Sequence, residues 1–270
     1  MLIDTHCHLD AIEFQSDRLA VIARAGTQGV GMIVIPAVSR ANFDVVRDLA
    51  HSFQGGAYAL GIHPICVPLA QTSDLDALEL QIQAALNDPR FVAIGEIGLD
   101  FFLPELKTPL MREKQEAFYA AQLDLAARYG LPVLLHVRRS QDLLLKHLRR
   151  RAQIGGIAHA FNGSFQQAGQ FIDQGFALGF GGAMTFSRAL QIRRLAEQLP
   201  LEALVLETDA PDIAPAWLGG PRQPAQRNEP AQVGRIAQTL ADLRGVNRES
   251  IVLATAQNAR RVLPRLARSI

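Results

Sequence analysis

The segment Leu2-Ile3-Asp4-Thr5-His6-Cys7-His8 decides the fold, because it joins a short apolar run directly to a histidine pair. Alternate side chains of an extended chain lie on the same face, so His6 and His8 are expected to point together into the interior while Cys7 points away. Two imidazoles placed in this way can chelate a metal ion. Two structural histidines held by hydrogen bonds would leave the same pattern, so the rest of the chain must decide between these interpretations.

Similar apolar runs recur along the chain at intervals of roughly 20 to 40 residues. Most of them are apolar throughout and do not alternate, a pattern typical of parallel strands that are covered on both faces. The predicted strands are residues 2–5, 32–36, 57–62, 91–97, 133–137, 156–160, 177–180 and 204–207.

Segments with helical spacing lie between these runs. In residues 112–129, apolar side chains recur on one face, and Gly130 and Pro132 supply a stop. The other predicted helices are residues 16–28, 40–53, 74–87, 140–152, 165–174, 187–198, 231–243 and 248–263.

Strands that alternate with helices at about 30 residues per unit match a (β/α)8 TIM barrel, so we predict an α/β fold in which residues 1–270 form one domain. The alternative is a doubly wound open sheet, but no G-x-G-x-x-G sequence follows the first strand. The longest stretch without periodicity, residues 210–230, is rich in proline, and we predict a loop over the site.

The composition is that of a globular protein, with 49% hydrophobic and 20% charged residues, which excludes disordered, fibrous and disulfide-scaffold classes. The apolar runs fall short of the ~18 residues of a membrane-spanning helix, and the chain does not begin like a signal peptide. The two cysteines, Cys7 and Cys66, fit a reducing compartment. We therefore expect a cytoplasmic protein that does not interact with membranes.

The net charge of +1 gives the molecule no global field that would attract a polyanion. Any phosphate chain must therefore be held locally, by arginines near the mouth of the barrel, although each of them could instead be a solvated surface residue. Trp217 in the predicted loop could stack on a nucleobase or anchor the loop against the barrel. The candidate arginines are Arg138, Arg139, Arg188, Arg222 and Arg227.

Polar residues follow several of the other apolar strands. They include His63, Glu96, His136, His159 and the pair Glu207 and Asp209. In a closed barrel all carboxyl ends of the strands meet at one mouth, so these residues are expected to converge with the first histidine pair. Buried polar groups of this kind are costly unless each is separately hydrogen-bonded or a divalent cation satisfies several together.

Six candidate ligands are more than one open catalytic zinc usually takes, so we predict two divalent metal ions, Zn, Mn or Mg, with Glu96 as the best bridge. Some barrel hydrolases use a carboxylated lysine as the bridge, but none of the three lysines lies at a predicted strand end. The six candidates are His6, His8, Glu96, His136, His159 and Asp209.

The set of motifs resembles the TatD family of metal-dependent deoxyribonucleases, and it runs from residue 3 to about residue 258. The motifs are Asp4-Thr5-His6-Cys7-His8, Gly95-Glu96-Ile97-Gly98-Leu99-Asp100, Pro132-Val133-Leu134-Leu135-His136, His159-Ala160-Phe161, Glu207-Thr208-Asp209-Ala210-Pro211 and Arg227-Asn228-Glu229-Pro230. The resemblance implies that His6, His8 and Asp209 hold one metal and that His136 and His159 hold the other, with Glu96 between them. The chain departs from the family at Phe101-Phe102, where tyrosines are frequent.

Together these features predict a hydrolase that uses a metal-activated water, most simply a phosphodiesterase acting on DNA or another phosphodiester. The resemblance alone implies trimming of single-stranded 3′ ends. The sequence points to no obligate protein partner. Two other functions stay open: an amidohydrolase acting on cyclic amides, lactones or amines, and a metal-binding protein without catalysis.

Roles can also be assigned to individual residues. Asp209 is expected to orient the water or accept its proton, with Glu96 as the other catalytic residue. Glu207 could assist Asp209, or it could pair with Arg227 or another arginine. For substrate binding we predict His63, Arg138 and Arg227, although His63 could equally be a packed histidine before Pro64.

Overall fold

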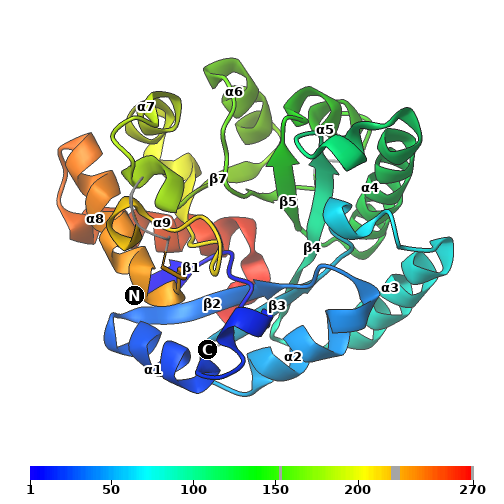
Figure 1. Cartoon of the computed structure of the whole chain (residues 1–270), viewed down its shortest axis with the longest axis horizontal. Coiled ribbons are helices and arrows are strands. Elements are labelled where there is room, and N and C mark those ends of the chain that lie inside the picture. The colour runs from blue at the N-terminus through cyan, green and yellow to red at the C-terminus, as the bar shows by residue number, and fades with distance from the viewer. Residues whose placement is uncertain (152–153, 220–225, 269–270) are drawn as a thin grey trace.

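The computed structural model describes residues 1–151, 154–219 and 226–268. Within them, eight parallel strands form one sheet in chain order, β1 to β8, and helices surround it (Figure 1). Every predicted strand is present. The strands are β1 (Leu2–Asp4), β2 (Val30–Pro36), β3 (Gly56–Leu60), β4 (Phe91–Asp100), β5 (Val133–Arg138), β6 (Gly156–Ala158), β7 (Phe176–Phe180) and β8 (Leu204–Leu206).

The sheet closes on itself between β8 and β1. The Thr5 N–H donates to the Leu206 carbonyl at 3.1 Å, and the Asp209 N–H donates to the His6 carbonyl at 2.9 Å. The His8 N–H in turn donates to the carbonyl of Ala210, the residue after Asp209, at 2.8 Å. The fold is therefore the predicted (β/α)8 barrel, and the open-sheet alternative is wrong.

The helices also follow the prediction, with changes at their ends. Helix α4 begins earlier than predicted, because Thr108 caps it by accepting a hydrogen bond from the Met111 N–H and Pro109 occupies the first turn. The helices are α1 (Arg18–Thr27), α2 (Phe43–His51), α3 (Thr72–Ala85), α4 (Pro109–Tyr129), α5 (Gln141–Leu148), α6 (Phe165–Asp173), α7 (Leu190–Gln198), α8 (Val233–Arg244) and α9 (Arg248–Val262).

The barrel interior is apolar at one end and polar at the other. A buried cluster joins strand residues such as Val34, Val92 and Leu134 to Ala259 and Leu263 at the end of α9. Helix α9 therefore plugs the amino-terminal end of the barrel. Small and branched side chains fill the interior as far as the polar strand ends, so the site can open only at the carboxyl-terminal mouth.

The predicted loop 210–230 does run from β8 toward α8, and Asn228 anchors the described part of it. The buried Asn228 amide donates to the carbonyls of Thr208 and Asp212, at 2.8 and 2.9 Å. Residues 220–225, which include Arg222, lie outside the described residues. Among the described residues, no helix combines the length and the hydropathy that a membrane span needs.

Candidate metal centre

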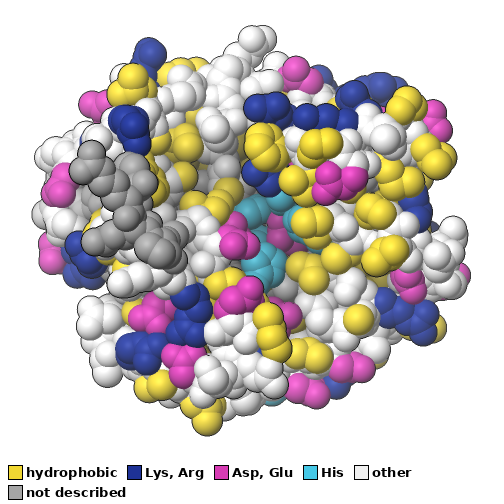
Figure 2. Space-filling model, viewed as in Figure 1, with side chains coloured by type: hydrophobic (Ala, Val, Ile, Leu, Met, Phe, Trp, Pro, Cys, Tyr) yellow, Lys and Arg dark blue, Asp and Glu magenta, His cyan; other side chains and the backbone are white. Residues whose placement is uncertain are grey.

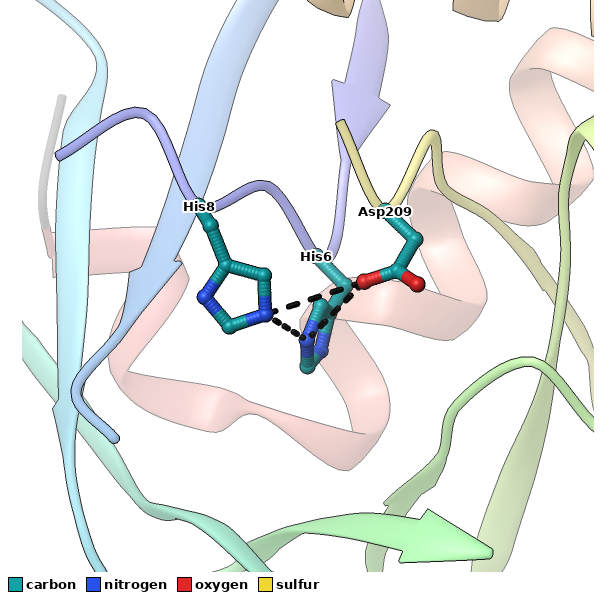
Figure 3. Close-up of side chains that lie close together, drawn as sticks. All are labelled: His6, His8 and Asp209. Carbon is teal, nitrogen blue, oxygen red and sulfur yellow. Dashed lines mark hydrogen bonds and ion pairs between the residues drawn. The ribbon is translucent and has the colours of Figure 1, made fainter. Parts of the chain in front are cut away.

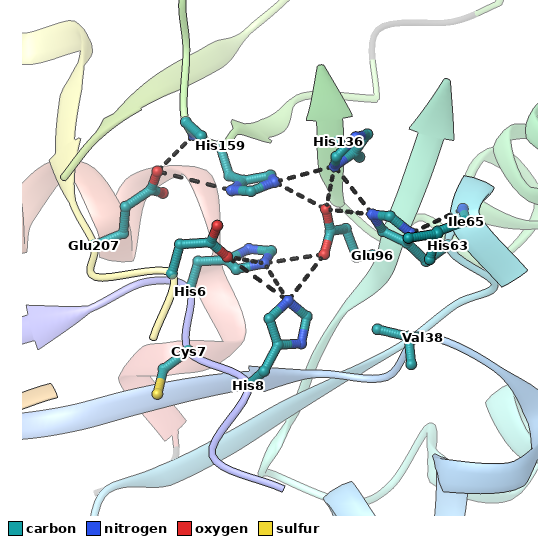
Figure 4. A network of polar contacts seen from close by, with 12 residues as sticks. His6, Cys7, His8, Val38, His63, Ile65, Glu96, His136, His159 and Glu207 are labelled. Carbon is teal, nitrogen blue, oxygen red and sulfur yellow. Dashed lines mark hydrogen bonds and ion pairs between the residues drawn. The ribbon is translucent and has the colours of Figure 1, made fainter. Parts of the chain in front are cut away.

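Three predicted ligands, from the segments that follow β1 and β8, lie together. The His6 and His8 imidazoles point toward each other, with Nε2 atoms 3.3 Å apart, and Asp209 faces both (Figure 3). Asp209 Oδ1 lies 3.6 Å from Nε2 of His6 and 3.7 Å from Nε2 of His8. Cys7 points away from this group, as alternation along the strand predicts (Figure 4).

Glu96, on β4, lies at the centre of the cluster (Figure 4). Its Oε2 is 3.0 Å from Nε2 of His6, and its Oε1 is 2.8 Å from Nε2 of His159 and 2.9 Å from Nδ1 of His136. The side chain is almost fully buried, with 1% of its surface exposed. One carboxylate thus faces ligands from opposite sides of the barrel through its two different oxygens.

His63, which was predicted to bind substrate, lies among the candidate metal ligands. Its Nε2 is 3.0 Å from Nδ1 of His136 and 3.2 Å from Oε1 of Glu96. Its Nδ1 accepts a hydrogen bond from the Ile65 N–H, which leaves Nε2 directed into the cluster. His63 therefore belongs to the donor set by position, whereas the sequence predicted a substrate-binding residue or a packed histidine before Pro64.

The donor set fits divalent cations. Ring nitrogens face ring nitrogens in three places, His6 with His8, His63 with His136 and His159 with His136, and two such nitrogens can share only one proton. A cation between them would satisfy several lone pairs at once, and nitrogen and oxygen donors together suit Zn²⁺ or Mn²⁺. The ligand atoms of three sets lie within 4.8 Å of one another: His6, His8 and Asp209; His6, Glu96 and His159; and His63, Glu96 and His136.

The ionisation of the centre also suits metal binding. Burial, followed by the nearby His159, lowers the pKa of His6 to about 3, so its imidazole is neutral at physiological pH. Burial opposes ionisation of Glu96, but the surrounding histidines hold its pKa well below its usual range. Burial would lower the pKa of His8 as well, yet the Glu96 carboxylate raises it to about 9. A metal bound here would therefore displace protons.

Two carboxylates that the sequence analysis gave no role support these ligands. Asp4 accepts hydrogen bonds from the Thr208 N–H and hydroxyl, at 2.9 and 2.6 Å, and so ties β1 to the segment that carries Asp209. Asp100 Oδ2 lies 3.2 Å from Nε2 of His136. Both residues stand inside the motifs quoted above, and their positions two or four residues from a candidate ligand were the available signal.

Glu207 contacts the cluster on the side of His159 that faces away from Glu96. The predicted alternative, a pair with Arg227, is wrong. Its Oε1 accepts a hydrogen bond from the Ala160 N–H and lies 3.8 Å from Nδ1 of His159. Burial raises the pKa of Glu207 to about 8. Arg227 instead forms a two-point ion pair with Asp17, with both N–O distances at 2.8 Å.

The cluster forms the floor of an open cleft of about 1010 Å³ (Figure 2). Of the predicted substrate residues, His63, Arg138 and Arg139 line this cleft. Arg188 and Arg227 are not among its described lining residues. Trp217 is a loop anchor: its indole N–H donates to Oε1 of Gln232 at 2.8 Å, and its ring packs against the core. Cys7 and Cys66 are both free thiols.

Comparison with known proteins identifies the family. A family model described as TatD related DNase matches residues 3–264. The chain belongs to this family. Membership in the TatD family confirms the resemblance that the motifs predicted, and it extends over nearly the whole chain.

Individual TatD relatives match along almost their full length. The chain is 40% identical over 257 residues to the uncharacterized metal-dependent hydrolase YjjV of Escherichia coli K12, with 95% of each chain covered. It is 32% identical to the 3′-5′ ssDNA/RNA exonuclease TatD of Klebsiella pneumoniae, with 96% of each covered. The crystal structure of E. coli YjjV, a TatD homologue, matches with a TM-score of 0.87 at 38% identity, over 97% of this chain and 98% of that one.

Proposed function

We propose that the protein is a divalent-metal-dependent phosphodiesterase that hydrolyses DNA or another phosphodiester. The observation that carries the proposal is the position of Glu96, whose Oε2 faces His6 while its Oε1 faces His136 and His159. A carboxylate that presents its two oxygens to two sets of imidazoles is suited to bridge two cations about 4 Å apart. The names of the relatives support a nuclease, since one of them is called an exonuclease acting on single-stranded DNA and RNA.

We assign the ligands to two sites. His6, His8 and Asp209 would hold one ion, and His136 and His159 the other, with Glu96 between them. His63 is close enough to Glu96 and His136 to complete the second site. Two ions bound there would polarise a phosphoryl oxygen, lower the pKa of a water molecule and neutralise developing charge.

The side chains of the protein provide the remaining chemistry. Asp209 lines the cleft and is 14% exposed, so its carboxylate can orient an attacking water and accept its proton. The water oxygen forms a bond to phosphorus, the bond to the leaving ester oxygen breaks, and the proton passes to that oxygen. Arg138 and Arg139 line the same cleft and can hold an adjacent phosphate.

These two arginines favour a phosphodiester over cyclic amides, lactones or amines, because every phosphodiester carries an anion for a guanidinium to bind, whereas the scissile groups of those other substrates are not anionic. The free thiols of Cys7 and Cys66 are in keeping with a reducing compartment, and we place the enzyme in the cytoplasm.

The proposal is tested by assaying the metal-loaded protein on labelled single-stranded DNA, on bis(p-nitrophenyl) phosphate and on a panel of cyclic amides and lactones. We expect hydrolysis of both phosphodiesters and a lower kcat/KM on DNA for Arg138→Gln. Hydrolysis of the cyclic amides or lactones in preference to the phosphodiesters would contradict the proposal.

A further inference from the structure

The charges around the cleft divide into two sides. Strands follow one another around the barrel in chain order, so the loops after β4 and β5 lie across the mouth from the loops after β8 and β1. Arg138, Arg139 and Phe102 line the first side, and Asp10, Glu13 and Asp212 line the second. In Figure 2, acidic side chains lie immediately to the left of and below the central histidines, and hydrophobic and basic ones border them above.

The basic side is built from stacked groups. The guanidinium carbons of Arg138 and Arg139 lie 3.9 and 4.8 Å from the centroid of the Phe102 ring, which is 39% exposed. Arg138 is 3.8 Å from Oδ2 of Asp100, but the His136 ring is closer to that oxygen, at 3.2 Å. Stacking fixes the planes of both guanidiniums while their N–H donors remain available to a phosphate.

The acidic side carries its charge without a matching cation among the described residues of the cleft. Glu13 and Asp212 are exposed, and Asp10 accepts a hydrogen bond from the neutral Asn42 amide at 2.9 Å. Two arginines lie beside them, but Arg227 is already held by the two-point ion pair with Asp17, and Arg18 donates to the carbonyls of Leu9, Asp10 and Ala11. A phosphate placed on this side would be repelled by these carboxylates. Salt would not screen the repulsion, because the charges would lie within the Debye length of about 8 Å.

We propose that the cleft binds a phosphodiester in one direction only. The strand continues over Arg138 and Arg139, and the departing terminal group lies toward Asp10, Glu13 and Asp212. The preferred substrate is therefore a nucleic-acid end that carries a hydroxyl, and a terminal phosphate on the departing group lowers the rate. This inference rests on the proposed function, because it places the scissile phosphate at the candidate metal centre between the two sides.

Short single-stranded oligonucleotides with either a hydroxyl or a phosphate at the 3′ end, and likewise at the 5′ end, test this direction. For whichever end is attacked, we expect kcat/KM to be about five- to tenfold lower when that end is phosphorylated. The double variant Glu13→Gln/Asp212→Asn should remove most of this difference. Asp76→Asn, an exposed position on α3, is the matched control and should keep it.

Salt dependence tests the other side. Loss of two phosphate contacts should reduce the slope of log(kcat/KM) against log[salt] by about 1.4 in Arg138→Gln/Arg139→Gln, while Glu13→Gln/Asp212→Asn should not reduce it. Equal rates on both kinds of end, or faster cleavage of the phosphorylated end, would overturn the inferred direction while the phosphodiesterase activity stood. Absence of hydrolysis of every oligonucleotide and of bis(p-nitrophenyl) phosphate would overturn the proposed function, and the direction with it.

Discussion

Oε1 of Glu207 lies 3.8 Å from Nδ1 of His159, the ring nitrogen opposite the one that faces Glu96. The same oxygen accepts a hydrogen bond from the Ala160 N–H, so Glu207 fixes the backbone that follows His159 and faces the imidazole at a distance longer than a hydrogen bond. Its Oε2 is buried without a hydrogen-bond partner among the described residues, and Glu207 lines a cavity of about 20 Å³, enough for one water molecule. Glu207 is therefore a positioning residue for a candidate ligand.

Replacing this carboxylate should weaken metal binding rather than unfold the protein. In Glu207→Gln we expect the affinity of the weaker metal site to fall about 10- to 100-fold, because the residue behind a ligating histidine fixes its ring and raises its basicity. Titration calorimetry with Mn²⁺ or Zn²⁺ measures this directly. Glu197→Gln, an exposed change on α7, is the control, and an unchanged affinity in Glu207→Gln would show that His159 needs no such support.

Removing metal should lower thermal stability, because the candidate ligands are buried and face one another. A metal at 100 times its Kd stabilises the folded state by about 2.7 kcal/mol, which is a Tm shift of roughly 5–10 °C for a chain of this size. Differential scanning calorimetry with and without a chelator measures the shift. The same Tm in both conditions would argue that the histidines and carboxylates satisfy one another without a metal.

Asn228 should be important for the stability of the loop after β8. Asn228→Ala leaves the buried carbonyls of Thr208 and Asp212 without their donor. We expect the free energy of unfolding to fall by about 1–3 kcal/mol, as measured by urea denaturation. Asn87→Ala, an exposed change after α3, should cost far less. Equal losses in the two variants would contradict the anchoring role.

Asp88, which lies just before β4 and away from the lining of the cleft, should make stability depend on acid pH. Burial would raise its pKa, but hydrogen bonds from His51, from the Arg90 N–H and from the Tyr58 hydroxyl hold that pKa below the usual 3.8. A carboxyl with a depressed folded pKa stabilises the protein above its unfolded pKa, and this contribution is lost as the pH falls through the folded value.

In Asp88→Asn, stability should therefore be lower at neutral pH and should fall less steeply below about pH 4. Urea denaturation across this range measures both effects. A variant with the same steepness as the wild type would contradict this explanation.

Much of the fold and the centre could be predicted from the sequence because both follow from short-range patterns. Alternation along β1 puts His6 and His8 on one face, and Glu96 and His159 also lie at or near the ends of apolar strands. Barrel topology then brings together residues that are as far apart in sequence as His6 and Asp209.

The residues that were harder to predict lie in loops or depend on contacts distant in sequence. Arg227 lies in a loop near the mouth, but a contact with Asp17, 210 residues away, turns its guanidinium to the outer rim. Trp217 likewise packs inward because Gln232 offers an acceptor for its indole N–H. No local pattern encodes either partner, so the direction of these side chains required the structure.

If Glu96 joins two metal ions in a phosphodiesterase, activity should depend on it, and the activity of Glu96→Ala on bis(p-nitrophenyl) phosphate with saturating Mn²⁺ measures this. We expect kcat/KM to fall by about 10³-fold or more, because both ions would lose their shared ligand. Glu113→Ala, an exposed change on α4, should keep wild-type activity. Full activity in Glu96→Ala would contradict the bridged two-metal mechanism.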